Sequence, residues 1–316
     1  MANATVAVGT YAGEAARPYV SAAILSADTI ANGYVSVLEN VHSKAVLRKF
    51  SGAAIQANDD CAFSTPAAGQ LTLGEAVLEA AALKVNEQVC NADLRATWES
   101  AQMRSQNSGA PADFTTFVAQ YVAAKVAESV EYNLWQGNFD KDGSGAGTPA
   151  YTSFNGILKA IQDASGTYKT AAAGAFTADD NATTGILTHL ESLTTSLPGS
   201  IQGDANAKIF MGRATANQYY RALAGTYNLP FLNDGLAARY AGYDIITPAG
   251  MPEDCLVLSK ADNLYFGTNL LTDHVQAAIL DLQGTTGDDV TRVIMQFSAG
   301  TQVVDHDSYS AVIRTS

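Results

Sequence analysis

The residue types most often used in metal and acid–base chemistry are few and scattered in this sequence. It has four histidines, His42, His189, His274 and His306, and no HExxH motif or other paired spacing joins them. A metal site built on histidine is therefore not predicted. The triplet Asp305-His306-Asp307 could attract a cation, but a solvated turn between two strands is favoured because polar triplets are common in loops. Neither a GxSxG nucleophile motif nor a GxxxxGK[ST] phosphate loop is present.

Alternating oxygen-bearing residues at 140–145 match the first half of a calcium-binding loop. The matching residues are Asp140, Asp142, Ser144 and Gly145, but the twelfth position is Tyr151, where such a loop needs a bidentate glutamate. A plain Asp/Gly turn is therefore favoured over a calcium site. The glycines of this segment also match a dinucleotide loop superficially, yet they follow a predicted helix rather than a strand. That match is too weak to predict a nucleotide site.

Adjacent carboxylates occur at Asp59-Asp60, Asp179-Asp180 and Asp288-Asp289. All three pairs lie in polar, turn-like surroundings, whereas a hydrolytic pair needs rigid elements that hold both carboxylates in a cleft. The sequence thus predicts no catalytic residue, no cofactor-binding residue and no metal ligand. In a large, well-patterned globular chain this absence favours a structural or assembly role over an enzyme.

Composition narrows the classes of protein further. With 47% hydrophobic and only 16% charged residues, the chain is too apolar to be intrinsically disordered. The 31 acidic against 18 basic residues give a net charge of -13, which disfavours sequence-independent binding to nucleic-acid phosphates. The three cysteines form no CxxC pattern, so neither a disulfide framework nor a zinc cluster is indicated. No membrane span or signal peptide is recognised, and a cytoplasmic setting is expected.

The strongest local pattern among the elements is a helix at residues 113–135. Apolar side chains recur there at every fourth position, and at about 100° per residue each such step advances the stripe by about 40° around the helix. The members are Phe114, Val118, Val122, Val126, Val130 and Leu134. One flat surface cannot cover so winding a stripe, so it suits a strut that meets several elements in turn, although an ordinary core helix over a sheet fits equally well.

Before this helix the pattern is less regular. The sequence predicts an extended arm at residues 1–20, a helix at residues 29–50 and a short amphipathic helix at residues 95–106. Between them, residues 51–94 form a long excursion without an obvious core of its own. Such a segment is either a flexible surface loop or one that another molecule covers.

After the strut the sequence contains a glycine-rich turn at 137–149 and a helix near 153–163. Helices at 185–197 and 214–223 then alternate with strands at 207–211, 242–247 and 255–258, which indicates a separate mixed lobe. The tail returns to strands, at 275–282, 290–297, 301–304 and 309–314, and these are expected to lie side by side and antiparallel.

The order of these parts resembles the major capsid proteins of tailed phages, which have the Hong Kong 97 type of capsid fold. Several segments carry the resemblance: LTLGEAVLEAAALKVNEQVCNADLRATWESAQM (71–103), PADFTTFVAQYVAAKVAESVEYNLWQGN (111–138), GSGAGTPAYTSFNGIL, YAGYDIITPAGMPEDCLVLSKADNLYFGTNLLTD (240–273) and VIMQFSAGTQVV. Together they cover most of residues 30–316. None is a catalytic signature, so the specificity lies in their order and coverage.

The resemblance implies an α+β fold with named parts. Residues 1–30 would be an N-terminal arm, residues 31–50 a helix leading into the extended loop, and residues 51–92 the extended loop itself. Residues 93–175 with 282–316 would form the peripheral domain, with its spine helix at 113–135, and residues 176–281 the axial domain. The extended loop would lie over a neighbouring subunit, which accounts for its missing core.

The resemblance also implies a function without catalysis. The chain would assemble as hexamers and pentamers into an icosahedral head that encloses double-stranded DNA, in a virion built in the bacterial cytoplasm. Portal, scaffold and decoration proteins are the further partners it implies; no membrane is involved, and DNA is met only by non-specific proximity. The family's Lys–Asn crosslink has no matching triad here. The alternatives are an encapsulin-like compartment shell and, in a different class, a calcium-dependent protein or enzyme that uses the turn at 140–145.

Overall fold

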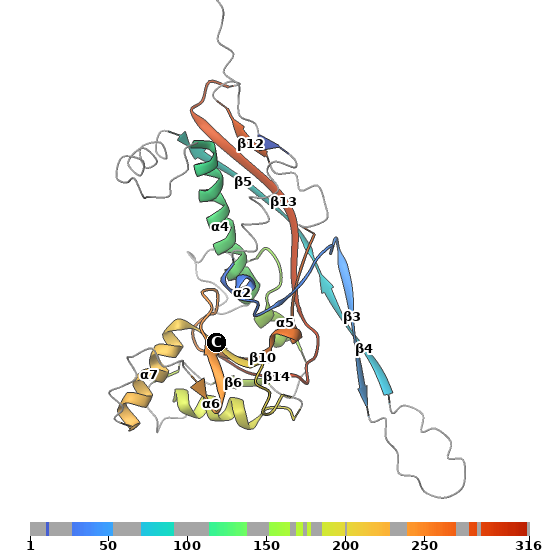
Figure 1. Ribbon diagram of the computed structural model, residues 1–316, viewed down its shortest axis with the longest axis vertical. Coiled ribbons are helices and arrows are strands. Elements are labelled where there is room, and N and C mark those ends of the chain that lie inside the picture. Colours follow the sequence, from blue (N-terminus) through green and yellow to red (C-terminus); the bar gives the residue numbers. More distant parts are fainter. Residues whose placement is uncertain are drawn as a thin grey trace, which may run out of the picture.

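The computed structural model describes residues 11–12, 27–52, 71–91, 114–137, 152–164, 169–172, 176–177, 185–199, 201–227, 239–269, 278–282 and 286–314. These residues form two six-stranded sheets and a projecting two-stranded hairpin (Figure 1). The hairpin consists of β3 (Lys44–Gly52) and β4 (Leu71–Glu79). Helices and strands are both abundant, so the expected α+β class is confirmed.

The first sheet is organised around β13 and is called the β13 sheet. The 14-residue strand β13 (Val290–Val303) pairs antiparallel with three shorter strands: β5 pairs with residues 290–299, β12 with residues 291–294 and β11 with residues 299–303. The order is β1-β12-β13-β11-β2, and β5 also pairs with β13. The shorter strands are β1 (Tyr11–Ala12), β2 (Ser36–Leu38), β5 (Ala81–Cys90), β11 (Leu264–Thr268) and β12 (Ala278–Asp281).

Helix α4 (Phe114–Gln136) packs on this sheet and confirms the helix predicted at residues 113–135. The stripe residues Val118, Val122, Val126, Val130 and Leu134 are all buried. Along its length the helix contacts β13, then helix α5 (Ile157–Asp163), and at its end the neighbouring sheet through Trp135. The winding stripe therefore does meet several elements in turn.

The second sheet, called the β10 sheet, has the order β6-β14-β10-β7-β9-β8. Its strands are β6 (Lys169–Ala172), β7 (Ala207–Met211), β8 (Arg239–Tyr240), β9 (Tyr243–Ile246), β10 (Cys255–Lys260) and β14 (Tyr309–Arg314). Helices α6 (Ile186–Thr195) and α7 (Arg213–Tyr227) lie beside it (Figure 1). The helices and strands predicted between residues 153 and 258 are all found within a few residues of their expected ends.

Alternate residues of the β10 sheet belong to two different hydrophobic cores. In β10, Leu256 and Leu258 pack with α6 and α7, while Val257 packs with α4 and α5. In β7, Met211 belongs to the first of these cores and Phe210 to the second. Because successive side chains of a strand point to opposite faces, one sheet separates the two cores and joins both.

The helix expected at residues 31–50 is wrong. A four-residue helix α2 (Asp28–Ala31) ends before Gly33, and the chain then forms β2 and β3. Gly33 and Asn40 both have positive φ, of 69° and 64°, which interrupts any continuous right-handed helix. Residues 44–52 also alternate between the two faces of a strand, and their backbone groups are satisfied by pairing with β4.

The tail strands do not stay together as expected. Residues 290–303 form one strand rather than two, and β12 pairs with it as predicted, but β14 leaves for the β10 sheet. The sheets also cross the expected boundary at 281–282, since β11 and β12 join the β13 sheet while β6 and β14 join the β10 sheet. The turn at 304–308, between β13 and β14, redirects the chain from one sheet to the other. The segments expected at 95–106 and 137–149 lie outside the described residues.

Candidate assembly interface

The hairpin β3–β4 presents two chemically different faces. Its antiparallel register pairs Lys44 with Glu79, Val46 with Val77 and Arg48 with Glu75. These residues lie at every second position, so their side chains share one face, and the intervening residues share the other. The sequence of the hairpin thus places ionic and apolar pairs alternately along one surface.

The first of these faces, called the outer face, is open to solvent. Lys44 Nζ lies 2.5 Å from Glu79 Oε1, and Arg48 Nε lies 3.7 Å from Glu75 Oε1, with all four side chains largely exposed. Between and beyond these ion pairs the apolar side chains of Val46, Leu73 and Val77 are 52%, 49% and 39% exposed. Such an apolar surface on a projecting ribbon has no partner within the described part of the chain and is typical of an interaction site.

The opposite face anchors the hairpin to the body. Leu78 is fully buried, and a Cβ on Gly267 would come within 2.6 Å of its side chain, so this leucine fits closely over β11. A Cβ on Gly300 would come within 2.1 Å of the Glu79 carbonyl oxygen, which explains why β13 has glycine there. Gln302 Nε2 donates a hydrogen bond to the Val77 carbonyl at 2.9 Å. The base of the hairpin is therefore firmly packed.

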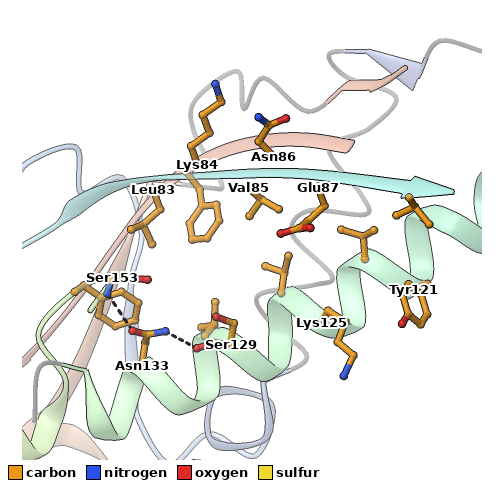
Figure 2. Close-up of a pocket in the computed structure, with 16 residues that line it drawn as sticks. Leu83, Lys84, Val85, Asn86, Glu87, Tyr121, Lys125, Ser129, Asn133 and Ser153 are labelled. Atoms are coloured by element: carbon orange, nitrogen blue, oxygen red, sulfur yellow. Dashed lines mark hydrogen bonds between the residues drawn. The ribbon is translucent and has the colours of Figure 1, made fainter. Parts of the chain in front are cut away.

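A second surface, lined by both apolar and polar residues, lies between β5 and α4. A groove of about 710 Å³ runs between the inner side of β5 and the side of α4, with Phe154 and Phe297 among its lining residues. Figure 2 shows Leu83, Val85 and Glu87 pointing from β5 towards α4, while Lys84 points away. At α4 the groove is bordered by Tyr121, which is 47% exposed.

The triplet at 305–307 does bind a cation, but the cation is a lysine of the hairpin. Lys49 Nζ contacts Asp305 Oδ1 and lies 3.1 Å from Asp307 Oδ2. The triplet also forms the turn between β13 and β14, so the interpretation as a turn between two strands is confirmed. Burial lowers the pKa of His306, and the nearby Asp305 carboxylate only partly opposes this.

The remaining candidates are dispersed. His42 lies on the surface, His189 is buried in α6, and Asp289 accepts a hydrogen bond from the Asn91 amide at 3.1 Å. Cys90 is exposed and Cys255 is buried. The other candidates, namely Asp59, Asp60, Asp140, Asp142, Gly143, Ser144, Gly145, Gly147, Tyr151, Asp179, Asp180, His274 and Cys61, lie outside the described residues.

Within the described ranges no group of three or more His, Cys, Asp or Glu side chains is arranged to hold a metal ion. Among the helices of the same residues, none combines the length and apolar character needed to cross a membrane.

Sequence reasoning missed the outer face of the hairpin. A helix is the wrong prediction for residues 44–49, because the alternation of charged and apolar residues in Lys44-Ala45-Val46-Leu47-Arg48 also matches a strand. The same alternation recurs in 73–79 with opposite charges. Two alternating segments with opposite charges are the pattern expected of paired strands, and this pattern could have predicted the hairpin and its outer face.

Comparison with known proteins gives no match by sequence. No family model matches the chain, and no curated protein does either.

Comparison with solved structures does give matches, and capsid chains are among them. A chain of the satellite phage P4 procapsid, whose structure includes the size determination (Sid) protein, aligns with a TM-score of 0.57 at 13% identity, covering 95% of this chain and 90% of that one. The capsid of the empty GTA particle aligns with a TM-score of 0.54 at 14% identity, covering 93% and 90%. The cyanophage A-1(L) capsid gives a TM-score of 0.54 at 15% identity, covering 90% and 92%. Over nearly its whole length, this chain therefore has the α+β fold of phage capsid proteins, as the resemblance in its sequence implied.

Proposed function

We propose that this chain is the major capsid protein of a tailed phage, a structural subunit without catalytic activity. The observation that carries the proposal is the outer face of the hairpin, an apolar surface projecting from a capsid fold with nothing in the described chain to cover it. Apolar side chains exposed on such a ribbon are unfavourable in water, and a neighbouring copy could cover them, because removing apolar surface from water is favourable by about 25 cal/mol per Å² before the costs of association.

The location of the exposed apolar residues supports assembly in rings. The hairpin leaves the body on the side away from α4, whereas Tyr121 lies on α4 at the groove (Figure 1). Two apolar surfaces that cannot meet within one molecule favour a head-to-tail contact between copies, and such contacts close into rings when the rotation allows. In the proposed function these rings are hexameric and pentameric capsomers, which together form an icosahedral shell.

The charge of the chain supports a container for DNA. A net charge of -13 repels phosphates, so a shell of many such subunits could enclose double-stranded DNA without adsorbing it tightly. The proposal places the protein in the virion, after assembly in the host cytoplasm. Portal, scaffold and decoration proteins complete the set of partners that such a head requires.

The proposal is tested by placing a charge on the outer face. In Leu73→Asp the carboxylate would have to be desolvated at the contact, so we expect a folded chain that forms no closed particles. Leu73→Met is the matched control, because it keeps the surface apolar and should assemble like the wild type. Electron microscopy scores the particles, and circular dichroism verifies that both variants are folded.

Two results would contradict the proposal. One is a Leu73→Asp variant that forms the same shells as the wild type, and the other is a wild-type chain that stays monomeric at high concentration. The content of nuclease-treated particles from the native host then distinguishes the shell types. Protected double-stranded DNA supports a phage head, whereas protein cargo without nucleic acid would indicate an encapsulin-like compartment.

A further inference from the structure

Beyond its packed base, the hairpin also contacts the body through the side chain of Lys49. On the face opposite Val46 and Arg48, Lys49 directs its ammonium group at Asp305 and Asp307 of the turn between β13 and β14. The side chains of Lys49 and Asp305 are each only 25% exposed. Contacts between charged groups that are shielded from water in this way are stronger than exposed surface pairs.

The receiving turn is itself held rigidly. The Ser308 hydroxyl donates to Asp305 Oδ2 at 2.5 Å, and the Asp307 backbone N–H donates to Asp305 Oδ1 at 2.7 Å. Asn263, which follows β10, donates to the Asp305 carbonyl at 2.9 Å and accepts from the Asp305 N–H at 2.7 Å. Asp305 is therefore held in position by several groups other than Lys49.

The protonation states also suit a permanent ion pair. Burial acts to lower the pKa of Lys49, but its hydrogen bonds with Asp305 and Asp307 outweigh this and the pKa is raised. For Asp305, burial acts to raise the pKa, but hydrogen bonds from Lys49, Ser308 and the Asp307 backbone prevail and the pKa is lowered.

The neighbouring ion pairs of the hairpin have a different geometry. Lys44 and Arg48 bind Glu79 and Glu75, which belong to the hairpin itself, so these contacts hold one strand to the other and not the hairpin to the body. Lys49, in contrast, contacts Asp305 of the body, which lies 256 residues away in the sequence. Lys49 lies farther along the hairpin than Leu78, which packs at its base. A contact at that distance from the base restricts the angle at which the hairpin projects from the body.

We propose that Lys49 with Asp305 and Asp307 forms an ionic latch that sets the angle at which the hairpin leaves the body. When the latch is broken, the ribbon stays paired but swings about its base at Leu78 and Gly300. Because the receiving turn connects the β13 sheet to the β10 sheet, the latch also ties the hairpin to the junction between the two sheets. The latch is a property of the single chain, and only its consequence for shell geometry rests on the proposed function.

The test measures the distance between the hairpin and the body in dilute subunits of the full chain. Spin labels replace Leu73 and Glu191, an exposed residue of α6, through genetically encoded amino acids that leave the cysteines untouched. Electron–electron resonance then gives the distance distribution. We expect a narrow distribution for the wild type and for Lys44→Met, and a broadened one for Lys49→Met. Lys44→Met is the matched control, because it removes an ion pair from the same strand without detaching the hairpin.

Hydrogen exchange of the β3 and β4 amides accompanies the distance measurement. Unchanged protection in Lys49→Met supports a ribbon that swings as a unit, whereas lost protection would mean that the hairpin unravels and would overturn the latch. A distribution as narrow as that of the wild type would overturn it as well. If Lys49→Met does not fold, the Asp305→Asn/Asp307→Asn variant replaces it, with the same outcomes.

The latch and the proposed function fail in different ways. Normal shells with an unchanged distance distribution in the variant overturn the latch and leave the capsid role intact. A broadened distribution in a chain whose wild type never forms shells supports the latch and contradicts the capsid role.

Discussion

At the scale of single residues, Glu131 is a charged group in an apolar joint. It is only 3% exposed, and the backbone N–H and hydroxyl of Thr29 both donate to its carboxylate, at 3.0 and 2.5 Å. The Trp135 indole donates in turn to the Thr29 hydroxyl at 2.9 Å. This network ties helix α2 to the end of α4. A buried carboxylate stabilises such a joint only while its hydrogen bonds are made, and the Gly250 backbone also bonds to Glu131.

We expect Glu131→Gln to destabilise the chain by about 1–3 kcal/mol, because the amide can accept only one of the two Thr29 bonds and leaves a buried donor unsatisfied. Burial raises the pKa of Glu131 above its ordinary value of 4.5, and the bonds from Thr29 offset this only partly. A raised folded-state pKa favours the folded chain at low pH, so that part of the stability is lost as pH rises from 4.5 through the raised pKa.

Denaturant unfolding at several pH values measures both effects. The Glu131→Gln variant should show a flatter stability curve than the wild type above pH 4.5. Glu128→Gln on the exposed side of the same helix is the control and should change little. Equal stability of the Gln variant and the wild type at every pH would contradict the role of the network.

At the scale of elements, α6 contains a buried histidine that packs against Phe176. His189 is 8% exposed and its ring lies 4.4 Å from that of Phe176, between centroids. Its Nε2 has no hydrogen-bond partner among the described residues. Burial lowers the pKa of His189, and the charge of Asp254 opposes this only partly. The helix is therefore packed around a neutral imidazole.

This packing predicts acid sensitivity in the α6 and α7 lobe. A lowered folded-state pKa means that the unfolded chain binds the proton more readily, so stability is lost as pH falls below the ordinary value of 6.5 through the lowered pKa. We expect His189→Leu to lose less stability than the wild type between about pH 7.5 and about pH 5. Denaturant unfolding at the two pH values gives the comparison, with His42→Gln on the surface as the control. An unchanged acid loss in His189→Leu would refute the assignment.

At the scale of the whole molecule, the β10 sheet makes two cores into one cooperative unit. Phe210 lies on the face towards α4, with its ring centroid 5.2 Å from that of Trp135 and 5.9 Å from that of Tyr34. Residues on the other face of the same strands pack against α6 and α7. Neither core can lose its packing without disturbing a sheet that the other core needs.

We therefore expect calorimetry of dispersed subunits to show one unfolding transition. Phe210→Ala, in the core shared with α4, should cost about 3–5 kcal/mol and lower that transition as a whole. Leu193→Ala, in the other core, should lower the same transition by about 2–5 kcal/mol. Two separate transitions, with each substitution moving only one of them, would show that the lobes unfold independently.

The sequence alone determined those elements whose signal is local. The four-residue spacing of valines from Val118 to Val130 predicts α4 and its buried stripe, because a helix satisfies its own backbone and repeats its faces over a few residues. Short apolar runs likewise predict β7 and β10. The order of such parts was enough to indicate the capsid fold. The matched capsid chains share this fold although only 13–15% of their residues are identical.

Only the tertiary structure decided which distant segments meet. Residues 31–50 have apolar positions that fit a helix as well as a strand, and the choice was made by β11, which pairs with residues 36–38, and by β4, which pairs with residues 44–52. In the same way, β14 joins the β10 sheet rather than its neighbour in sequence, β13. Lys49 meets Asp305 only because that turn lies beside the hairpin. The spacing of apolar residues indicates which face of a segment is buried. It does not indicate which other segment covers that face, because such long-range contacts form only when the whole chain folds.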